Sequence, residues 1–165
     1  MQILRRLRDR VNPHGTLDVY VYSHSEDAPP LLVTQWRQHN LVTLSGRNLI
    51  RDLMACQPGV TGLSYYAVGT SNTAASFADV ALGTEVYRDT IIKFERENGL
   101  LKTYFYLPTT AANGVTLCEV GEFGDDASST VDSGTLYART VLAQSIAKTI
   151  DISVTFIHSN LWEAV

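Results

Sequence analysis

The densest group of chemically active side chains is a short acidic segment, Gly121-Glu-Phe-Gly-Asp-Asp126. Its three carboxylates lie near a turn and could supply oxygen ligands to a calcium ion, but the segment lacks the repeated ligand spacing of an EF-hand loop. We therefore expect a solvated acidic turn rather than a metal site. Glu119 and Glu122 are separated by an odd offset, which places them on opposite faces of a strand and argues against the paired carboxylates of a glycoside hydrolase.

The histidines and serines do not form a recognisable catalytic pattern. The four histidines lie far apart, and none is three to five residues from another histidine or a cysteine, as a zinc site often requires. No serine occupies a GxSxG turn, and His39 beside Asn40 is interpreted as a hydrogen-bonding residue at a strand end. Gly62 and Gly69 flank a strand and do not form the GxGxxG pattern of a dinucleotide site. The sequence thus predicts a protein that is not an enzyme and that has no catalytic residue, cofactor or metal.

Tyrosines recur in the segments expected to be strands. Such tyrosines more often form a half-buried sheet surface than a functional site. The alternative is a platform on which sugar rings stack, as in a carbohydrate-binding module. The tyrosines in question are Tyr20, Tyr22, Tyr65, Tyr66, Tyr104 and Tyr106.

The N-terminal segment combines apolar residues with arginines. Three apolar side chains would form one stripe if the segment were helical, and four arginines accompany them. Asn12-Pro13-His14-Gly15 would end any helix before the first strand. We predict that residues 1–15 are a docking arm; the alternative is a frayed terminus whose arginines only add solubility. The candidate interface residues are Ile3, Leu4, Arg5, Arg6, Leu7, Arg8 and Arg10.

Length and composition bound the protein class. The chain has 165 residues, of which 45% are hydrophobic, and a formal net charge of −4. These values predict a single domain at 16–165, with a sub-boundary candidate at 56–62, and they disfavour nucleic acid as the main partner. No stretch is typical of a secretion signal or a membrane span, so we expect synthesis in a cytoplasm and no membrane partner. Cys56 and Cys118 lack CxxC spacing, and we expect buried free thiols, with one bridge as the alternative.

One amphipathic helix is expected at 46–56. Ser45 is the predicted N-cap, and the apolar positions that follow recur at helical spacing on one face. Pro58-Gly59 should end the helix.

The rest of the chain has the composition and alternation of β-strands. Asn98-Gly99 stands between two expected strands and is the strongest signal for a two-residue hairpin. Many short strands with one helix predict a mainly β fold, an antiparallel β-sandwich of the Greek-key or jelly-roll type. The expected strands are 16–22, 31–36, 63–68, 85–95, 100–107, 115–123, 135–142 and 146–158.

Three parts of the sequence carry a family resemblance: His39–Leu53; Tyr65–Thr70 with Ala81–Arg88; and Leu117–Phe123 with Ser133–Arg139. Together they resemble a family of small bacteriophage virion proteins found among tail-fibre, baseplate and capsid-associated genes. The resemblance covers roughly residues 39–158. The chain departs from the family pattern at Ser71, where a glycine is usual, and at Val80, where a threonine is common.

The resemblance implies a β-rich assembly module without catalysis, working in symmetric copies in the virion. We expect a tail-associated component of the fibre, baseplate or adaptor. A capsid decoration protein is the alternative, a carbohydrate-binding receptor-recognition module is the further alternative, and a hydrolase on a jelly-roll scaffold is the least favoured. The expected partners are other virion proteins and further copies of the chain, with a trimer favoured, and a host surface glycan is the remaining candidate.

Overall fold

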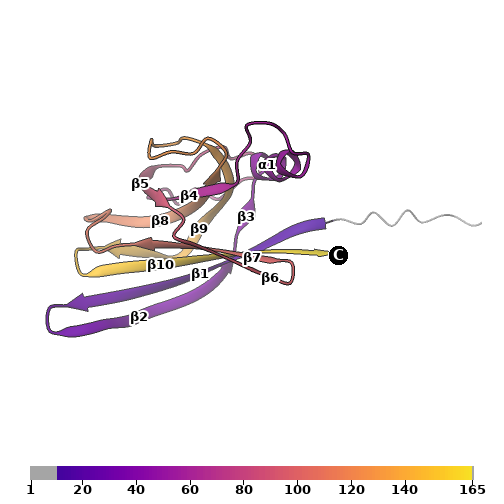
Figure 1. Cartoon of the computed structure of the whole chain (residues 1–165). Helices are drawn as coiled ribbons and strands as arrows, with labels where there is room; N and C mark the ends of the chain where they lie inside the picture. The colour runs from indigo at the N-terminus through magenta and orange to yellow at the C-terminus, as the bar shows by residue number, and fades with distance from the viewer. Residues whose placement is uncertain (1–10, 165) are drawn as a thin grey trace, which may run out of the picture.

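The computed structural model describes residues 11–164 as two antiparallel sheets that pack face to face, with one helix beside them (Figure 1). Sheet A has the strand order β2-β1-β10-β7-β6, and sheet B has the order β3-β9-β8-β4-β5. The predicted mainly β sandwich with one short helix is confirmed. In chain order the elements are β1 (Val11–Ser25), β2 (Ala28–His39), β3 (Leu41–Val42), α1 (Leu44–Met54), β4 (Leu63–Gly69), β5 (Glu85–Thr90), β6 (Lys93–Glu97), β7 (Leu100–Leu107), β8 (Val115–Gly124), β9 (Thr135–Lys148) and β10 (Ile152–Ala164).

Alternate strand residues fill the space between the sheets, as the period of two along each strand requires. Tyr66 of sheet B stacks on Phe105 of sheet A with ring centroids 5.3 Å apart, and Phe105 lies 5.9 Å from Phe156. These aromatic contacts join both sheets in one core. The buried residues of this core are Leu17, Val19, Val21, Tyr66, Val68, Phe105, Leu107, Ala111, Leu117, Val120, Leu142, Ile146, Val154 and Phe156.

The hairpin predicted at Asn98-Gly99 is confirmed. These two residues connect β6 to β7 and have φ angles of 41° and 80°. Positive φ at both central positions is what a two-residue turn between twisted strands needs, and Asn-Gly adopts it at low cost.

The strand expected at 85–95 is in fact two strands in different sheets. β5 is an edge strand of sheet B and β6 is an edge strand of sheet A. The chain crosses over at two adjacent residues: the Ile91 amide donates to the Ser64 carbonyl at 2.9 Å, and the Ile92 amide donates to the Tyr104 carbonyl at 2.9 Å. The amides of two consecutive residues therefore donate to different sheets. No glycine or proline occurs at the point where the chain passes from one sheet to the other.

The break expected between 142 and 146 is absent, because β9 continues to Lys148 and the turn follows at 149–151. Lys148 is almost fully buried, and its ammonium group donates to the Asn113 side chain at 2.9 Å and to the Thr149 carbonyl at 3.0 Å. Burial lowers the pKa of Lys148. The residue thus ties the end of β9 to the turn before β8.

The helix begins two residues earlier than expected. Its N-cap is Thr43, whose hydroxyl accepts a hydrogen bond from the Gly46 amide at 3.0 Å, so the prediction of Ser45 as the cap was wrong. The Ser45 hydroxyl instead donates to the Leu136 carbonyl of β9 at 2.8 Å. A Cβ atom at Gly46 would lie 2.1 Å from the Tyr137 carbonyl oxygen, which shows how closely α1 packs on β9. Within residues 11–164, no helix is long and apolar enough to span a membrane.

The first strand begins at Val11, five residues before the expected start. β1 pairs with β10 from Val11 opposite Ala164, so positions 11–15 belong to sheet A and not to an arm. β1 also lies inside sheet A, between β2 and β10. The elements before and after 56–62 therefore share both sheets.

Candidate functional site

The outer face of sheet B is covered by two loops, and a buried arginine holds each of them. Arg139 of β9 donates to the Glu119 carboxylate of β8 at 2.8 Å and to Asp79 in the loop after β4, also at 2.8 Å. The same guanidinium donates to the Thr73 carbonyl at 3.0 Å. Glu119 in turn accepts the backbone amide of Thr84 at 2.8 Å. The loop 70–84 is therefore fixed to the sheet by charge-assisted hydrogen bonds.

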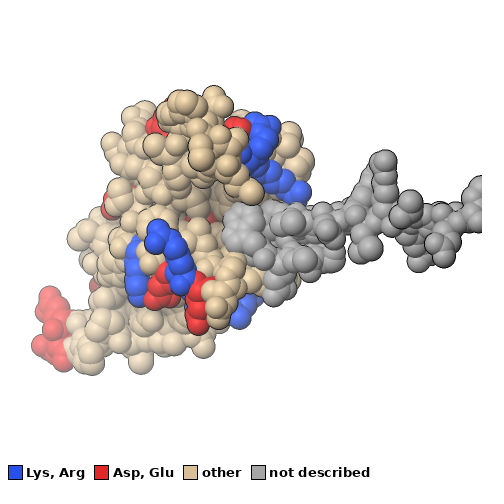
Figure 2. Space-filling model, turned by 45° about the vertical axis from the view of Figure 1, so that its right-hand side comes forward, with Lys and Arg blue, Asp and Glu red and all other residues tan. Residues whose placement is uncertain are grey.

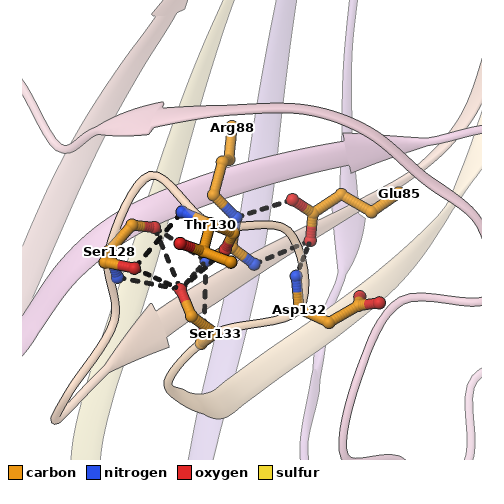
Figure 3. Close-up of polar contacts among 6 residues, drawn as sticks. All are labelled: Glu85, Arg88, Ser128, Thr130, Asp132 and Ser133. Carbon is orange, nitrogen blue, oxygen red and sulfur yellow. Dashed lines mark hydrogen bonds and ion pairs between the residues drawn. The ribbon is translucent and has the colours of Figure 1, made fainter.

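Arg88 of β5 does the same for the loop after β8 (Figure 3). Its guanidinium makes two hydrogen bonds with Glu85, at 2.6 and 2.7 Å, and donates to the carbonyls of Ser128 and Ser133 at 3.0 and 2.9 Å. The guanidinium also lies over the ring of Phe123, 4.6 Å from its centroid. This network fixes the loop 125–134.

These two networks support the fold. A surface pocket of about 430 Å³ adjoins the first one and is lined by Arg139, Asp79 and Thr73, but the hydrogen bonds of Arg139 are directed to the loop and to Glu119. The side chains of Arg88 and Arg139 are 2% and 3% exposed. The hydroxyl of Ser133 contacts Ser128, Thr130 and Arg88, and no imidazole lies among its hydrogen-bond partners. A nucleophilic serine would need such a base.

A third polar cluster lies inside the sandwich. Glu122 of sheet B contacts the imidazole Nδ1 of His158 of sheet A, and Glu122 also accepts a hydrogen bond from Thr103. The Tyr66 hydroxyl lies 2.7 Å from the Thr103 hydroxyl. All four side chains are fully buried. The cluster therefore joins the two sheets and has no opening through which a substrate could enter.

Burial and neighbouring groups shift the pKa values of Glu122 and Tyr66 in this cluster. Burial alone would raise the pKa of Glu122, but the contact with His158 and the hydrogen bond from Thr103 outweigh it and hold the pKa below its ordinary value. Burial and the nearby Glu122 charge raise the pKa of the Tyr66 hydroxyl well above its ordinary value. The carboxylate thus remains ionised and the phenol remains neutral at neutral pH.

The carboxylates considered for calcium do not converge. Glu122 points into the core and Glu119 points to the outer face, as their odd offset predicted. Asp125 is held by Thr61, whose carbonyl accepts the Asp125 amide at 3.1 Å. No group of histidine, cysteine and carboxylate side chains that could hold a metal ion occurs in the part of the chain that the structure describes. Cys56 and Cys118 are free thiols, but Cys56 is exposed and Cys118 is half-buried, so the expectation of burial was wrong.

One surface hollow is apolar. It lies between α1 and the β6–β7 hairpin, has a volume of about 390 Å³, and is called the apolar groove below. Met54 is 81% exposed there, and Phe94 and Leu53 are 42% and 38% exposed. In the view of Figure 2 the charged side chains form a few separate groups, with wide uncharged areas between them. The groove is lined by Leu49, Ile50, Leu53, Met54, Gly62, Leu63, Phe94, Arg96, Leu101 and Tyr137.

The outer face of sheet A carries four of the six tyrosines and is called the open face below. In Figure 1 the loops and α1 lie around sheet B, and no described loop covers the lower sheet. The strand register places Tyr20 and Tyr106 on either side of Thr155, and Tyr104 lies one row further along. Tyr65 and Tyr66 belong to sheet B, where Tyr66 is buried in the core. The structure therefore brings together Tyr20, Tyr22, Tyr104 and Tyr106, and it separates the other two.

A pocket rich in basic side chains adjoins these tyrosines. The register aligns His39, Thr16, Ser159 and Lys102 in one row across β2, β1, β10 and β7. With Arg37 and the apolar Leu100 and Leu161, they line a pocket of about 380 Å³, called the basic pocket below. Sequence analysis did not find this group, because each residue comes from a different strand.

The predicted interface residues of the arm, Ile3, Leu4, Arg5, Arg6, Leu7, Arg8 and Arg10, lie outside the described residues. Their role stays a prediction.

No family model, curated protein or solved structure matches the chain.

Proposed function

We propose that this chain is a non-enzymatic bacteriophage virion structural protein, a tail-associated assembly component that works in symmetric copies. The resemblance of three sequence segments suggests this class of protein. The apolar groove is the observation that carries the proposal, because exposed apolar surface of this kind is typical of a protein–protein contact.

The chemistry of the groove fits a permanent contact between subunits. Met54, Leu53 and Phe94 project from two different elements, and neighbouring Ile92 is 63% exposed. Large flexible and aromatic side chains of this kind contribute most to subunit interfaces when a partner covers them. We assign the groove to contacts between copies, and we retain the trimer as the expected oligomer.

The β1–β2 hairpin supplies a second contact surface. β2 is an edge strand of sheet A, and its residues Leu31, Leu32 and Val33 are exposed. Soluble proteins usually protect such an edge with charges or cover it with another chain. Pro29 and Pro30 block pairing at the start of the strand, so a partner would pair beyond them.

The test is the oligomeric state of the purified protein, measured by sedimentation and by light scattering after gel filtration. We expect a homo-oligomer, and we expect Met54→Glu with Phe94→Glu to dissociate it without lowering the melting temperature, because both side chains are exposed in one copy. Ile150→Glu is the matched control, since Ile150 is 69% exposed on the turn before β10 and away from the groove. A protein that stays monomeric at high concentration, or an oligomer that tolerates both groove substitutions, would contradict the proposal.

The arm is tested separately. Because positions 11–15 lie in β1, the deletion should remove residues 1–10 only. We expect the shortened protein to keep its melting temperature and to be incorporated less well into particles. Incorporation equal to that of the full chain would show that the arm has no docking role.

A further inference from the structure

We propose that the open face is a binding site for an acidic glycan, a sugar chain that carries carboxylate or sulfate groups. An acidic group would lie in the basic pocket, and sugar rings would lie against Tyr104 and Tyr20. This inference goes beyond the assembly role and does not depend on it.

The pocket offers unused hydrogen-bond donors. Arg37 contacts Asp18 through Nε at 2.6 Å and through Nη2 at 2.9 Å, so its Nη1 group remains available. Neither Lys102 Nζ nor the hydroxyls of Thr16 and Ser159 donate to another described residue. Guanidinium, ammonium and hydroxyl donors around one hollow are suited to a carboxylate or a sulfate.

The basic groups around the pocket are balanced by carboxylates, and Lys102 is the cation that enters no described ion pair. Arg37 and Lys93 pair with Asp18 and Glu95, and Glu97 stands opposite the pocket residue Leu100. An acidic group would therefore bind mainly through Lys102 and the Nη1 group of Arg37. Long-range attraction to nucleic acid would need a larger basic surface, whereas one or two acidic groups on a sugar chain match these few cations.

The tyrosines supply the contact for the sugar rings. Tyr104 lies in the row next to the pocket, and Tyr20 and Tyr106 lie in the row after it. A hydrogen bond to Glu95 holds the Tyr104 side chain and raises its pKa to about 12. The Lys93 ammonium group lies over this ring, 5.0 Å from its centroid, so a sugar would contact the ring surface that Lys93 leaves free. The rigidity of the ring lowers the entropy cost of binding.

A glycan fits this face better than a protein partner does. Hydroxyls, amides and paired charges alternate with the tyrosines along the rows, as in Gln35, Thr155 and Ser159, and the few apolar side chains do not form a continuous patch. Sugar hydroxyls can replace the water on such groups one by one. The apolar groove on another part of the surface already offers the chemistry that a protein partner needs.

Calorimetric titration of the intact protein tests the proposal with three probes: a heparin octasaccharide, a polygalacturonate octamer and neutral maltooctaose. We expect one or both acidic probes to bind, which also distinguishes sulfate from carboxylate, and maltooctaose to bind at least about tenfold more weakly. Lys102→Gln should weaken the acidic probe about tenfold. Tyr104→Ala should weaken it as well, and Tyr104→Phe should weaken it less, because the ring is kept and only its hydrogen bond to Glu95 is lost. Arg51→Gln on α1 is the matched control for loss of one exposed charge and should have no effect.

Several outcomes would overturn the proposal. One is that neither acidic probe binds, and another is that Lys102→Gln and Tyr104→Ala leave the binding unchanged. A third is that inorganic sulfate or phosphate competes as strongly as the octasaccharide, which would indicate a site for a free anion only. Lys102→Gln and Tyr104→Ala should also leave the oligomeric state unchanged. Dissociation of the oligomer by these variants would show that the open face is a subunit interface instead, whereas failure of the assembly proposal would leave the titration result intact.

Discussion

The two outer faces of the sandwich differ in whether loops cover them. Loops 70–84 and 125–134 cover sheet B, and each is held by one buried arginine that reaches a carboxylate and backbone carbonyls. Sheet A has the same number of strands but carries tyrosines, hydroxyls and charged pairs, with no described loop over them. The comparison indicates that buried ion pairs, with Leu82 packed beneath one loop, order the two loops on sheet B, and that sheet A keeps a regular surface on which a ligand can lie.

The largest effect should come from removing the arginine that contacts two carboxylates. Arg139→Leu leaves Glu119 buried without its cation and releases Asp79, so we expect a loss of about 3–5 kcal/mol in the free energy of unfolding. Chemical denaturation measures it. Arg139→Lys keeps the charge but loses the planar fork of donors, and should lie between the wild type and the leucine variant.

The control for this variant is Arg51→Ala, which breaks an exposed pair with Asp52 on α1. We expect a change of about 0–1 kcal/mol there. A loss below about 1 kcal/mol in Arg139→Leu would show that the loop is held by other contacts.

Replacement of Arg88 should lower the free energy of unfolding by less than replacement of Arg139, and it should affect only one loop. Arg88→Leu removes the partner of Glu85 and the donors to Ser128 and Ser133, and we expect a loss of about 3 kcal/mol. Hydrogen exchange should accelerate in 125–134 and stay unchanged in 70–84, because the two networks share no residue. Equal acceleration in both loops would contradict the assignment of one arginine to each loop.

The sequence pattern predicted the strands better than it predicted what joins them. Residue composition and turn formers located β4, β7 and β8 to within one residue, and Asn98-Gly99 predicted its hairpin, because these signals are local. Alternation found the centre of β1 but missed its first five residues. The transfer of the chain between sheets at Ile91 and Ile92 has no local signal, since both residues are good strand formers. The cap was misplaced because Thr43 and Ser45 are both suitable hydroxyl residues, and packing on β9 decides between them.

The candidate sites could be predicted even less well than the connections between strands, because strand register and sheet packing bring their residues together. Glu122 and His158 are far apart in sequence, and only the packing of two sheets makes them a pair. Thr16, His39, Lys102 and Ser159 belong to four strands, so no window of sequence contains the basic pocket. The separation of Tyr66 from Tyr104 follows from the topology in the same way.

The buried contact between Glu122 and His158, which joins the two sheets, leads to a prediction about the pH dependence of stability. The folded pKa of Glu122 is below its unfolded value of about 4.3, so the carboxylate stabilises the fold above that pH and this contribution is lost as the pH falls through the folded pKa. We expect Glu122→Gln to lower the free energy of unfolding at neutral pH by about 1–3 kcal/mol and to reduce its decline between about pH 5 and pH 3. Urea denaturation across this range measures both. The exposed Glu26→Gln, in the turn between β1 and β2, serves as the control, and an acid decline in Glu122→Gln as steep as in the wild type would contradict the prediction.

The smallest effect on stability should come from the open face. Tyr106 is 39% exposed and no described side chain donates to its hydroxyl, so Tyr106→Ser should change the free energy of unfolding by about 1 kcal/mol or less. The same denaturation series measures it. A loss as large as that of the buried arginines would mean that this face is structurally required and would remove the contrast between the two sheets.

The most direct test of the proposed assembly role is an electron cryomicroscopy map of particles purified from the source that encodes the chain, with the sandwich fitted into density. The account predicts symmetric copies in the tail, with the apolar groove of each copy covered by a neighbour. Absence of the protein from purified particles, or copies whose grooves face solvent, would contradict it.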